Sequence, residues 1–278
     1  MKRILVTTDL SSNSRAGLRF AINLAGQKKT ELVFLFVHQL LRASNWSDAK
    51  YEYFVSEDNK NVMKELTDFV EGTYEQMKIK PGKYKCAIHH QFATVDGIIS
   101  YAQDNECDYI CIATRGAGTV KKLFGTNTAA LIKKSPIPVL CIPSGYKAAK
   151  PVSKLLYASD MTNHEKELEQ VLAFAKPLKA TVELLHMSFP YEMAMDNQAA
   201  EKSLKQKFRY DIAIHYKERD FDKTLMVDLE RAVEKAKPSV VAMFTKQDRS
   251  LFDRIFLGSA AAQYSFSTNV PLLIFKKG

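Results

Sequence analysis

Long apolar runs are missing from this chain of 278 residues. No stretch approaches the roughly 18 consecutive apolar residues that a membrane span requires. At the start, the basic pair Lys2 and Arg3 is followed by apolar residues only at positions 4–6 before polarity returns. Such a run is too short for the core of a signal peptide and is typical of a first β-strand. The sequence therefore predicts a protein without a membrane partner and with a cytoplasmic location.

Paired cysteine motifs are also absent. The four cysteines, Cys86, Cys107, Cys111 and Cys141, form no Cys-x-x-Cys pair, and no histidine cluster accompanies them. Structural zinc usually needs that paired spacing, so no zinc site is expected. The last three lie beside or within apolar runs, which predicts buried free thiols, as in a reducing cytoplasm.

Positive charge is in moderate excess, and glycine is scarce in the second half of the chain. The formal net charge is +9, but the basic residues are dispersed and form no stripe with aromatic residues. This pattern does not favour nucleic-acid binding. Nine of the eleven glycines precede residue 151, and only Gly258 and Gly278 follow it. Because glycine lets a backbone approach a ligand closely, a glycine-rich cradle is expected in the first half.

Strand and helix patterns alternate through the first half. Apolar runs predict strands at residues 4–6, 31–38, 84–88, 109–113 and 139–142, and helix-spaced apolar residues predict helices at 15–26, 56–76, 95–103 and 126–134. Between them, Ser11 to Ser14 offer helix N-cap chemistry, and residues 41–55 are expected to form a surface loop, with a lid or a partner surface as the alternative. The order βαβαβαβαβ predicts a parallel sheet covered by helices on both faces.

The pattern restarts after a linker at residues 144–153. Residues 154–160 echo residues 3–9, a helical stretch at 163–178 follows, and the run 181–186 echoes 31–38. Later echoes are a helix at 228–237, a strand at 240–244, the Gly-Ser pair at 258–259 and a proline-led strand at 269–275. The second copy is about 18 residues shorter between its second and fourth strands. Two divergent copies of one α/β unit, expected as domains 1–146 and 152–278, explain the length.

The segment after the strand at 109–113 is the most informative. It reads Ala113-Thr-Arg-Gly-Ala-Gly-Thr-Val-Lys-Lys-Leu-Phe-Gly-Thr-Asn-Thr128, so a glycine-bearing loop ends on Gly-Thr at a helix start. Helix-start amides and hydroxyls bind anions, aided by the helix dipole. This is phosphate-cradle chemistry, although the Gly-Lys-Ser/Thr of a Walker loop is missing. An ordinary strand–turn–helix connection is the alternative.

With this segment, the sequence resembles the universal stress proteins, as two tandem copies over nearly the whole chain. Nucleotide-binding members carry Gly-x2-Gly-x9-Gly-Ser/Thr after the fourth strand, and the matching residues are Ala113, Gly116, Gly125 and Thr126. Alanine replaces the first glycine, and the second gap holds eight residues instead of nine. The resemblance implies two Rossmann-like domains of the adenine nucleotide alpha hydrolase type, each a five-stranded parallel sheet with helices on both faces. It also implies ATP, ADP or AMP over the carboxyl ends of the strands.

The resemblance gives roles to residues at the ends of the first two strands. Thr7, Thr8 and Asp9 would contact adenosine and its ribose. Asp9 would accept from a ribose hydroxyl or help to hold Mg²⁺, with capping of the next helix as the alternative. Val37 would offer its backbone to the adenine edge, with simple core packing as the alternative.

The phosphates would lie further along the same edge. Gly116, Gly125 and Thr126 would bind them through amides and a hydroxyl, and Arg115 would add charge there or lie exposed. Ala113 closes the strand before the loop. Asn127 and Thr128 are weaker candidates, because a polar helix start needs capping residues in any case.

The second copy departs from this pattern. Its signature positions fall on Thr245 and Asp248, and bulky Gln247, Arg249 and Phe252 surround them. An aspartate at a phosphate loop repels polyphosphate, so this copy is expected not to bind ATP and to act as a structural partner. The last strands of the two copies, 139–142 and 272–275, are expected to pair within the chain as a pseudo-dimer that covers two exposed edges, with a homodimer as a further option.

No catalytic or metal-binding group stands out. The histidines form only one adjacent pair, His89-His90, and no Ser/Cys–His–Asp pattern can be assigned. By resemblance, the chain is expected to be a stress-response or signalling protein that binds an adenine nucleotide in its first domain and acts on an unknown protein partner. Two alternatives stay open: a nucleotide-independent interaction protein, and a slow ATPase, which would need a catalytic base near Gly125 that the sequence does not show.

Overall fold

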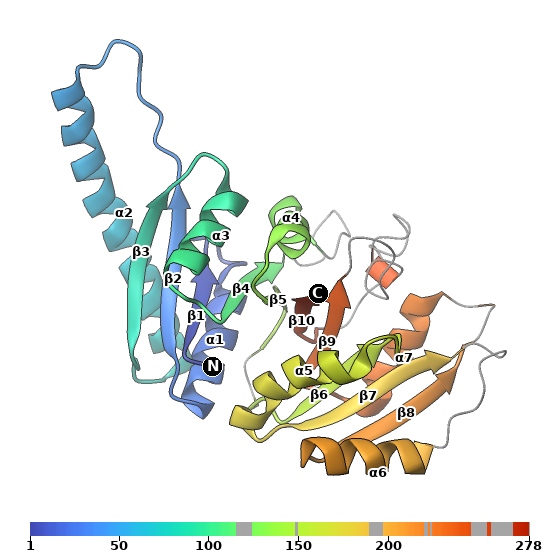
Figure 1. Ribbon diagram of the computed structural model, residues 1–278. Helices are drawn as coiled ribbons and strands as arrows, with labels where there is room; N and C mark the ends of the chain where they lie inside the picture. Colours follow the sequence, from blue (N-terminus) through green and yellow to red (C-terminus); the bar gives the residue numbers. More distant parts are fainter. Residues whose placement is uncertain are drawn as a thin grey trace.

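The computed structural model describes residues 1–114, 124–147, 150–188, 197–219, 222, 224–245, 255–256 and 269–277. The elements of its first half follow the predicted order (Figure 1). They are β1 (Arg3–Thr7), α1 (Arg15–Gln27), β2 (Glu31–His38), α2 (Asp48–Met77), β3 (Tyr84–His90), α3 (Thr94–Asp104), β4 (Tyr109–Thr114), α4 (Thr126–Lys134) and β5 (Val139–Pro143). The alternation of strand and helix that the sequence predicts is therefore confirmed here.

The second half repeats this alternation. Its elements are β6 (Lys154–Ser159), α5 (His164–Leu178), β7 (Thr181–Ser188), α6 (Asn197–Phe208), β8 (Ile212–Glu218), α7 (Leu225–Ala236), β9 (Val240–Thr245) and β10 (Leu272–Lys276). The strand β8 and the helix α6 have no counterpart in the sequence prediction, which left residues 187–227 unassigned. With β8 included, the described residues of the second half form five strands, as do those of the first.

The ten strands of the described residues form one sheet, in the order β3-β2-β1-β4-β5-β10-β9-β6-β7-β8. Within each half the neighbouring strands are parallel, and the two halves join where β5 and β10 pair antiparallel with Leu273 opposite Leu140. The last strands of the two copies therefore pair within one chain, as expected from the sequence. Figure 1 shows the sheet passing from one half to the other through this junction.

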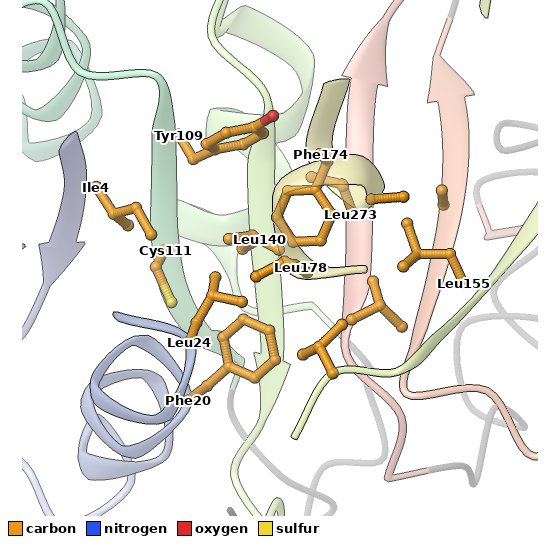
Figure 2. Packing of buried hydrophobic residues seen from close by; sticks show 14 of the residues in the cluster. Ile4, Phe20, Leu24, Tyr109, Cys111, Leu140, Leu155, Phe174, Leu178 and Leu273 are labelled. Carbon is orange, nitrogen blue, oxygen red and sulfur yellow. The ribbon is translucent and has the colours of Figure 1, made fainter. Parts of the chain in front are cut away.

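Helices cover both faces of the sheet and bury two hydrophobic clusters. One cluster joins the sheet to α1, α2, α5 and α6, and the other joins it to α3, α4 and α7. The first cluster crosses the junction, where Phe20 and Leu24 of α1 lie near Leu140, with Phe174 of α5 on the other side (Figure 2). The rings of Tyr109 and Phe174 meet edge to face, 5.2 Å between centroids. Burial of apolar surface stabilises the folded state by about 25 cal/mol per Å². Because this cluster contains residues of both halves, the halves share one hydrophobic core.

The end of α1 is fastened to the linker between the halves. The amide of Gln27 donates to the carbonyl of Val152 at 3.1 Å, and its oxygen accepts from the Val152 backbone N–H at 2.8 Å. Val152 is itself buried in the first cluster. The linker residues 150–153 are thus held against the first half by a paired set of hydrogen bonds.

The helix α2 differs from its prediction. It begins at Asp48, eight residues before the predicted start, so the expected surface loop at 41–55 is wrong for its second part. Ser47 caps the helix by accepting from the N–H of Lys50 at 3.3 Å. The buried residues of α2 start only at Leu66, so the earlier turns carry no periodic apolar signal. Figure 1 shows this part of α2 extending beyond the sheet.

The cysteines and the membrane prediction can also be compared with the structure. Cys107, Cys111 and Cys141 are buried, Cys86 is half-buried, and all four are free thiols. Burial raises the pKa of Cys107 to about 11, which keeps this thiol protonated at neutral pH. In the described part of the chain, no helix combines the length and the hydropathy needed to cross a membrane.

Candidate functional site

A cavity of about 230 Å³ opens at the carboxyl ends of β1, β2 and β4, beside the start of α4. It brings together nine of the residues predicted from the sequence. They are Thr7, Thr8, Asp9, Val37, Ala113, Gly125, Thr126, Asn127 and Thr128. The two other predicted residues, Arg115 and Gly116, lie outside the described residues.

The rest of the cavity wall was not predicted. The turn before α1 contributes Ser11, Asn13 and Ser14, and α3 contributes Thr94 and Ile98. The serines were interpreted only as helix-capping residues, because nothing in the sequence shows that the turn after β1 faces the start of α4. Thr94 and Ile98 carried no polar motif that would have marked them.

The carboxylate of Asp9 is held in a fixed direction by the turn that follows it. Its Oδ1 accepts from the N–H of Ser11 at 3.0 Å and from the Ser11 hydroxyl at 2.5 Å. Leu10 between them has φ = 60°, in the left-handed region that non-glycine residues rarely adopt. Asp9 is exposed, and it has no ion-pair partner among the described residues. The alternative role of Asp9 as cap of α1 is therefore not observed, since the N-cap position is Ser14.

The neighbouring hydroxyls serve the turn itself. The Thr8 hydroxyl lies 2.8 Å from the Ser14 hydroxyl and accepts from the N–H of Leu10 at 3.0 Å. Ser14 donates to the carbonyl of Ser11 at 2.8 Å and makes no side-chain capping bond to α1. These contacts bury Thr8 and Ser14 at the base of the cavity and leave the exposed Asp9 carboxylate as the charged group of its described wall.

The start of α4 supplies hydrogen-bond donors to the other side of the cavity. Gly125 is the N-cap, with no side-chain capping bond and no acidic residue in the first turn, and Lys133 and Lys134 lie in the last turn. The first amides of a helix have no intrahelical acceptor, and the helix dipole makes this end positive. Thr126 and Asn127 are exposed there, whereas Thr128 is buried. The helix start is therefore suited to an anion such as a phosphate group.

Two glycines let helices approach the cavity closely. A Cβ on Gly17 of α1 would lie 3.2 Å from the backbone nitrogen of Ala113, at the end of β4. A Cβ on Gly97 of α3 would lie 3.1 Å from Cγ1 of Val37 and 2.8 Å from Cβ of Gln91. Contacts this short leave no room for a larger side chain, so these glycines fix where α1 and α3 border the site.

The second half carries the same turn, but its aspartate is already paired. Asp160 accepts from the N–H and hydroxyl of Thr162, and Met161 has φ = 62°, as in the first half. The ammonium of Lys277 lies 3.1 Å from both carboxylate oxygens of Asp160 and 2.9 Å from Oε1 of Glu167. The Lys277 and Glu167 side chains are only 6% and 5% exposed. An internal lysine thus neutralises the group that matches Asp9.

Further hydrogen bonds complete this ion cluster, which we call the Lys277 cluster (Tyr157, Asp160, Thr162, Glu167 and Lys277). Tyr157 donates to Oε2 of Glu167, and Lys277 donates to the Thr162 hydroxyl at 2.8 Å. Burial acts to lower the pKa of Lys277, but its hydrogen bonds to Glu167 and Asp160 outweigh it and raise the pKa above the ordinary lysine value. The lysine therefore stays charged inside the cluster.

Other predicted features can be placed only in part. Gln247, Asp248, Arg249, Phe252, Gly258 and Ser259 lie outside the described residues. His38 and His90 contact α2, through Asp58 at 2.6 Å and Asn59 at 2.8 Å respectively. Within the described part of the chain, no group of three or more His, Cys, Asp or Glu side chains is arranged to hold a metal ion.

Comparison with known proteins shows which solved structures share this fold. No protein of curated function is significantly similar in sequence. The structure is similar to a universal stress protein from Archaeoglobus fulgidus DSM 4304, at 21% identity and a TM-score of 0.69, over 99% of this chain and 98% of that one. It is also similar to a functionally unknown protein from Pseudomonas aeruginosa PAO1, at 15% identity and a TM-score of 0.56, over 99% of this chain and 92% of that one. These two likenesses show a shared fold over the full length.

The sequence itself matches the model of the universal stress protein family over residues 1–143. That match covers the half of the chain that contains the cavity with Asp9 and Gly125. The chain therefore belongs to the universal stress protein family.

Proposed function

We propose that the first half binds an adenine nucleotide in the cavity at the carboxyl ends of β1, β2 and β4. The observation that carries the proposal is the pairing of two chemistries in one cavity: the Asp9 carboxylate on one side and the uncapped start of α4 on the other. A nucleotide needs both, because its ribose offers hydroxyl donors and its phosphates carry negative charge.

Different residues of the cavity would contact the ribose, the adenine and the phosphates of the nucleotide. Asp9, held by Ser11, would accept from the ribose hydroxyls or hold a Mg²⁺ ion that the phosphates bring. The backbone of Val37 would face the adenine edge. The amides at Gly125, Thr126 and Asn127 and the Thr126 hydroxyl would bind the phosphates. Arg115 and Gly116, which the resemblance also assigns to phosphate binding, lie outside the described residues. The apolar wall of Leu35, Ile98 and Ile112 would cover the base.

The second half is proposed not to bind nucleotide in this way. The ammonium of Lys277 donates to the Asp160 carboxylate at 3.1 Å. A ribose hydroxyl or a Mg²⁺ ion would therefore have to displace a buried ammonium to reach this carboxylate. Breaking such a pair leaves a buried charge without compensation, which costs several kcal/mol. We therefore propose one nucleotide per chain, in domain 1–146, with domain 152–278 as a structural partner.

The biological role follows from the family and is proposed at that level. The chain would act in stress response or signalling, where nucleotide occupancy changes the surface around the start of α4 that a protein partner reads. Apart from Asp9, no Asp, Glu or His lines the described wall of the cavity, and we propose nucleotide binding and not hydrolysis as its role. A nucleotide-independent interaction protein is the outcome that the following experiment would reveal.

Thermal unfolding of the full chain with ATP, ADP or AMP, with and without Mg²⁺, tests the proposal. Cyclic AMP belongs in the set, because another universal stress protein was solved in complex with cAMP. A ligand at 100 times its Kd should stabilise the fold by about 2.7 kcal/mol. Asp9→Asn should reduce this stabilisation, whereas the matched control Asp104→Asn, at the far end of α3, should not. The proposal fails if no nucleotide raises the Tm.

A further inference from the structure

A second, larger cavity lies at the opposite edge of the sheet in the first half. Its volume is about 760 Å³, within the range of about 300–1,000 Å³ that is typical of small-molecule pockets. The starts of β1 and β2, the end of α1 and the connection from α2 to β3 build it. It shares no lining residue with the nucleotide cavity, so the two are separate.

The floor of this cavity lies over the first hydrophobic cluster. Ile22, Leu32 and Tyr74 border it but are at most 3% exposed, so the accessible apolar surface comes from other side chains, such as the half-buried Ala25. Ile79 also lines it and is 39% exposed, although a large apolar side chain favours burial. The cavity therefore offers two accessible apolar side chains, Ala25 and Ile79, that a ligand would cover.

The rim carries an excess of positive charge. Five cationic side chains line the cavity against two carboxylates, Glu31 and Glu106. Glu31 already pairs with Arg3 at 2.9 Å and with Lys83 at 3.5 Å. The three remaining lysines, Lys2, Lys29 and Lys80, have no ion-pair partner among the described residues. A ligand that brings one negative group would find unpaired ammonium groups there.

We propose that this cavity binds a small anionic amphiphile, a molecule with one acidic head group and an apolar body. The head group lies among Lys2, Lys29 and Lys80. The body packs on Ala25 and covers Ile79. The site is independent of nucleotide binding in the first half.

Calorimetric titration of the full chain with dodecanoate below its micellar concentration tests this proposal. One site per chain is expected, with at least tenfold weaker binding of dodecyltrimethylammonium, which has the same chain length and the opposite charge. Lys29→Glu should weaken dodecanoate binding at least tenfold. The adjacent Lys28→Glu is the matched control, since Lys28 is exposed and does not line the cavity, and it should leave binding unchanged.

A second variant tests whether the ligand's apolar body lies inside the cavity. Ala25 lines the cavity and is half-buried, so Ala25→Phe should fill the space and abolish dodecanoate binding while nucleotide binding stays unchanged. The proposal is overturned if dodecanoate does not bind, if the Lys28 and Lys29 variants bind it equally, or if saturating ATP displaces it. Failure of every nucleotide to bind would overturn the proposed function and leave this site standing.

Discussion

The two halves of the sheet carry the same turn in opposite surroundings. In each, an aspartate follows the first strand, the next residue has φ near +60°, and the hydroxyl residue after it donates to the aspartate. Asp9 remains exposed at a cavity, whereas Asp160 is paired with Lys277. The local backbone is thus retained in both copies, and the charge brought by a distant residue decides whether the carboxylate is available to a ligand.

The position that makes this difference lies directly after the last strand of each half. Lys277 comes directly after β10, and the residue at the matching position after β5 is Ser144, counted from Pro138 and Pro271. A serine cannot reach and neutralise an aspartate as lysine does. The comparison therefore suggests that one substitution at a strand end, together with Glu167, converts an open carboxylate into a closed ion cluster.

Removing Lys277 should have the largest effect on the free energy of unfolding. Lys277→Met leaves Asp160 and Glu167 without their cation, and breaking a buried pair in this way costs about 3–5 kcal/mol of the free energy of unfolding. We expect a value near the low end, because the Asp160 side chain is still 28% exposed. Urea denaturation at pH 7 measures it.

The neighbouring residue provides the control for this loss. Lys276→Met removes a lysine that is exposed, so it should change stability by less than about 0.5 kcal/mol. The double variant Lys277→Met with Glu167→Gln should recover part of the loss, since it removes one of the uncompensated carboxylates. Equal stability of the two lysine variants would show that the Lys277 cluster does not stabilise the fold.

Transplanting the lysine should close the first site. Ser144→Lys places an ammonium at the strand end that matches Lys277, and we expect it to pair with Asp9. Nucleotide binding should then weaken about tenfold, which is 1.4 kcal/mol, as measured by calorimetric titration with ATP. Ser144→Met, of similar length but without charge, is the control. If both variants bind ATP as the natural chain does, the difference between the halves does not reside at this position.

Much of the fold could be predicted from the sequence because its signals are local. The apolar run of β2 and the Ser-Pro stop after α4 predict the observed boundaries, since burial on both faces and helix capping act over a few residues. The first turns of α2 were missed because that part of the helix buries nothing. The strand β8 was missed because it alternates only weakly, between buried Ile212 and Ile214 and exposed His215.

The site was predictable only where a motif carried it. The resemblance gave Asp9, Val37 and Gly125, and the structure places all three at one cavity. The Lys277 cluster had no motif, because its lysine lies 117 residues from Asp160. Such a contact depends on the position of β10 in the sheet, and a single sequence does not show this pairing.

Lowering the pH should produce the smallest effect on stability. It should reveal the contribution of Asp160, which Lys277 pairs, in contrast to the unpaired Asp9. Burial acts to raise the pKa of Asp160, but hydrogen bonds from Thr162 and Lys277 outweigh it and hold the pKa below the ordinary aspartate value. A carboxyl with a lowered folded pKa stabilises the fold above its unfolded pKa of about 3.9, and this contribution disappears as the pH falls through the folded pKa. The free energy of unfolding should therefore depend on Asp160 at neutral pH and progressively less below about pH 4.

Comparison with Asp160→Asn isolates this contribution from that of other carboxylates. Glu31, Glu165 and Glu201 also have lowered pKa values because of their lysine or arginine partners, so both chains lose stability in acid. The readout is the difference between the natural chain and Asp160→Asn in urea denaturation at pH 7, 5 and 3. That difference should shrink between pH 5 and 3, because the protonated aspartate and asparagine are then both neutral beside Lys277. A difference that stays constant over this range would mean that Lys277 is not neutralising an ionised Asp160, and the contrast with Asp9 would need another cause.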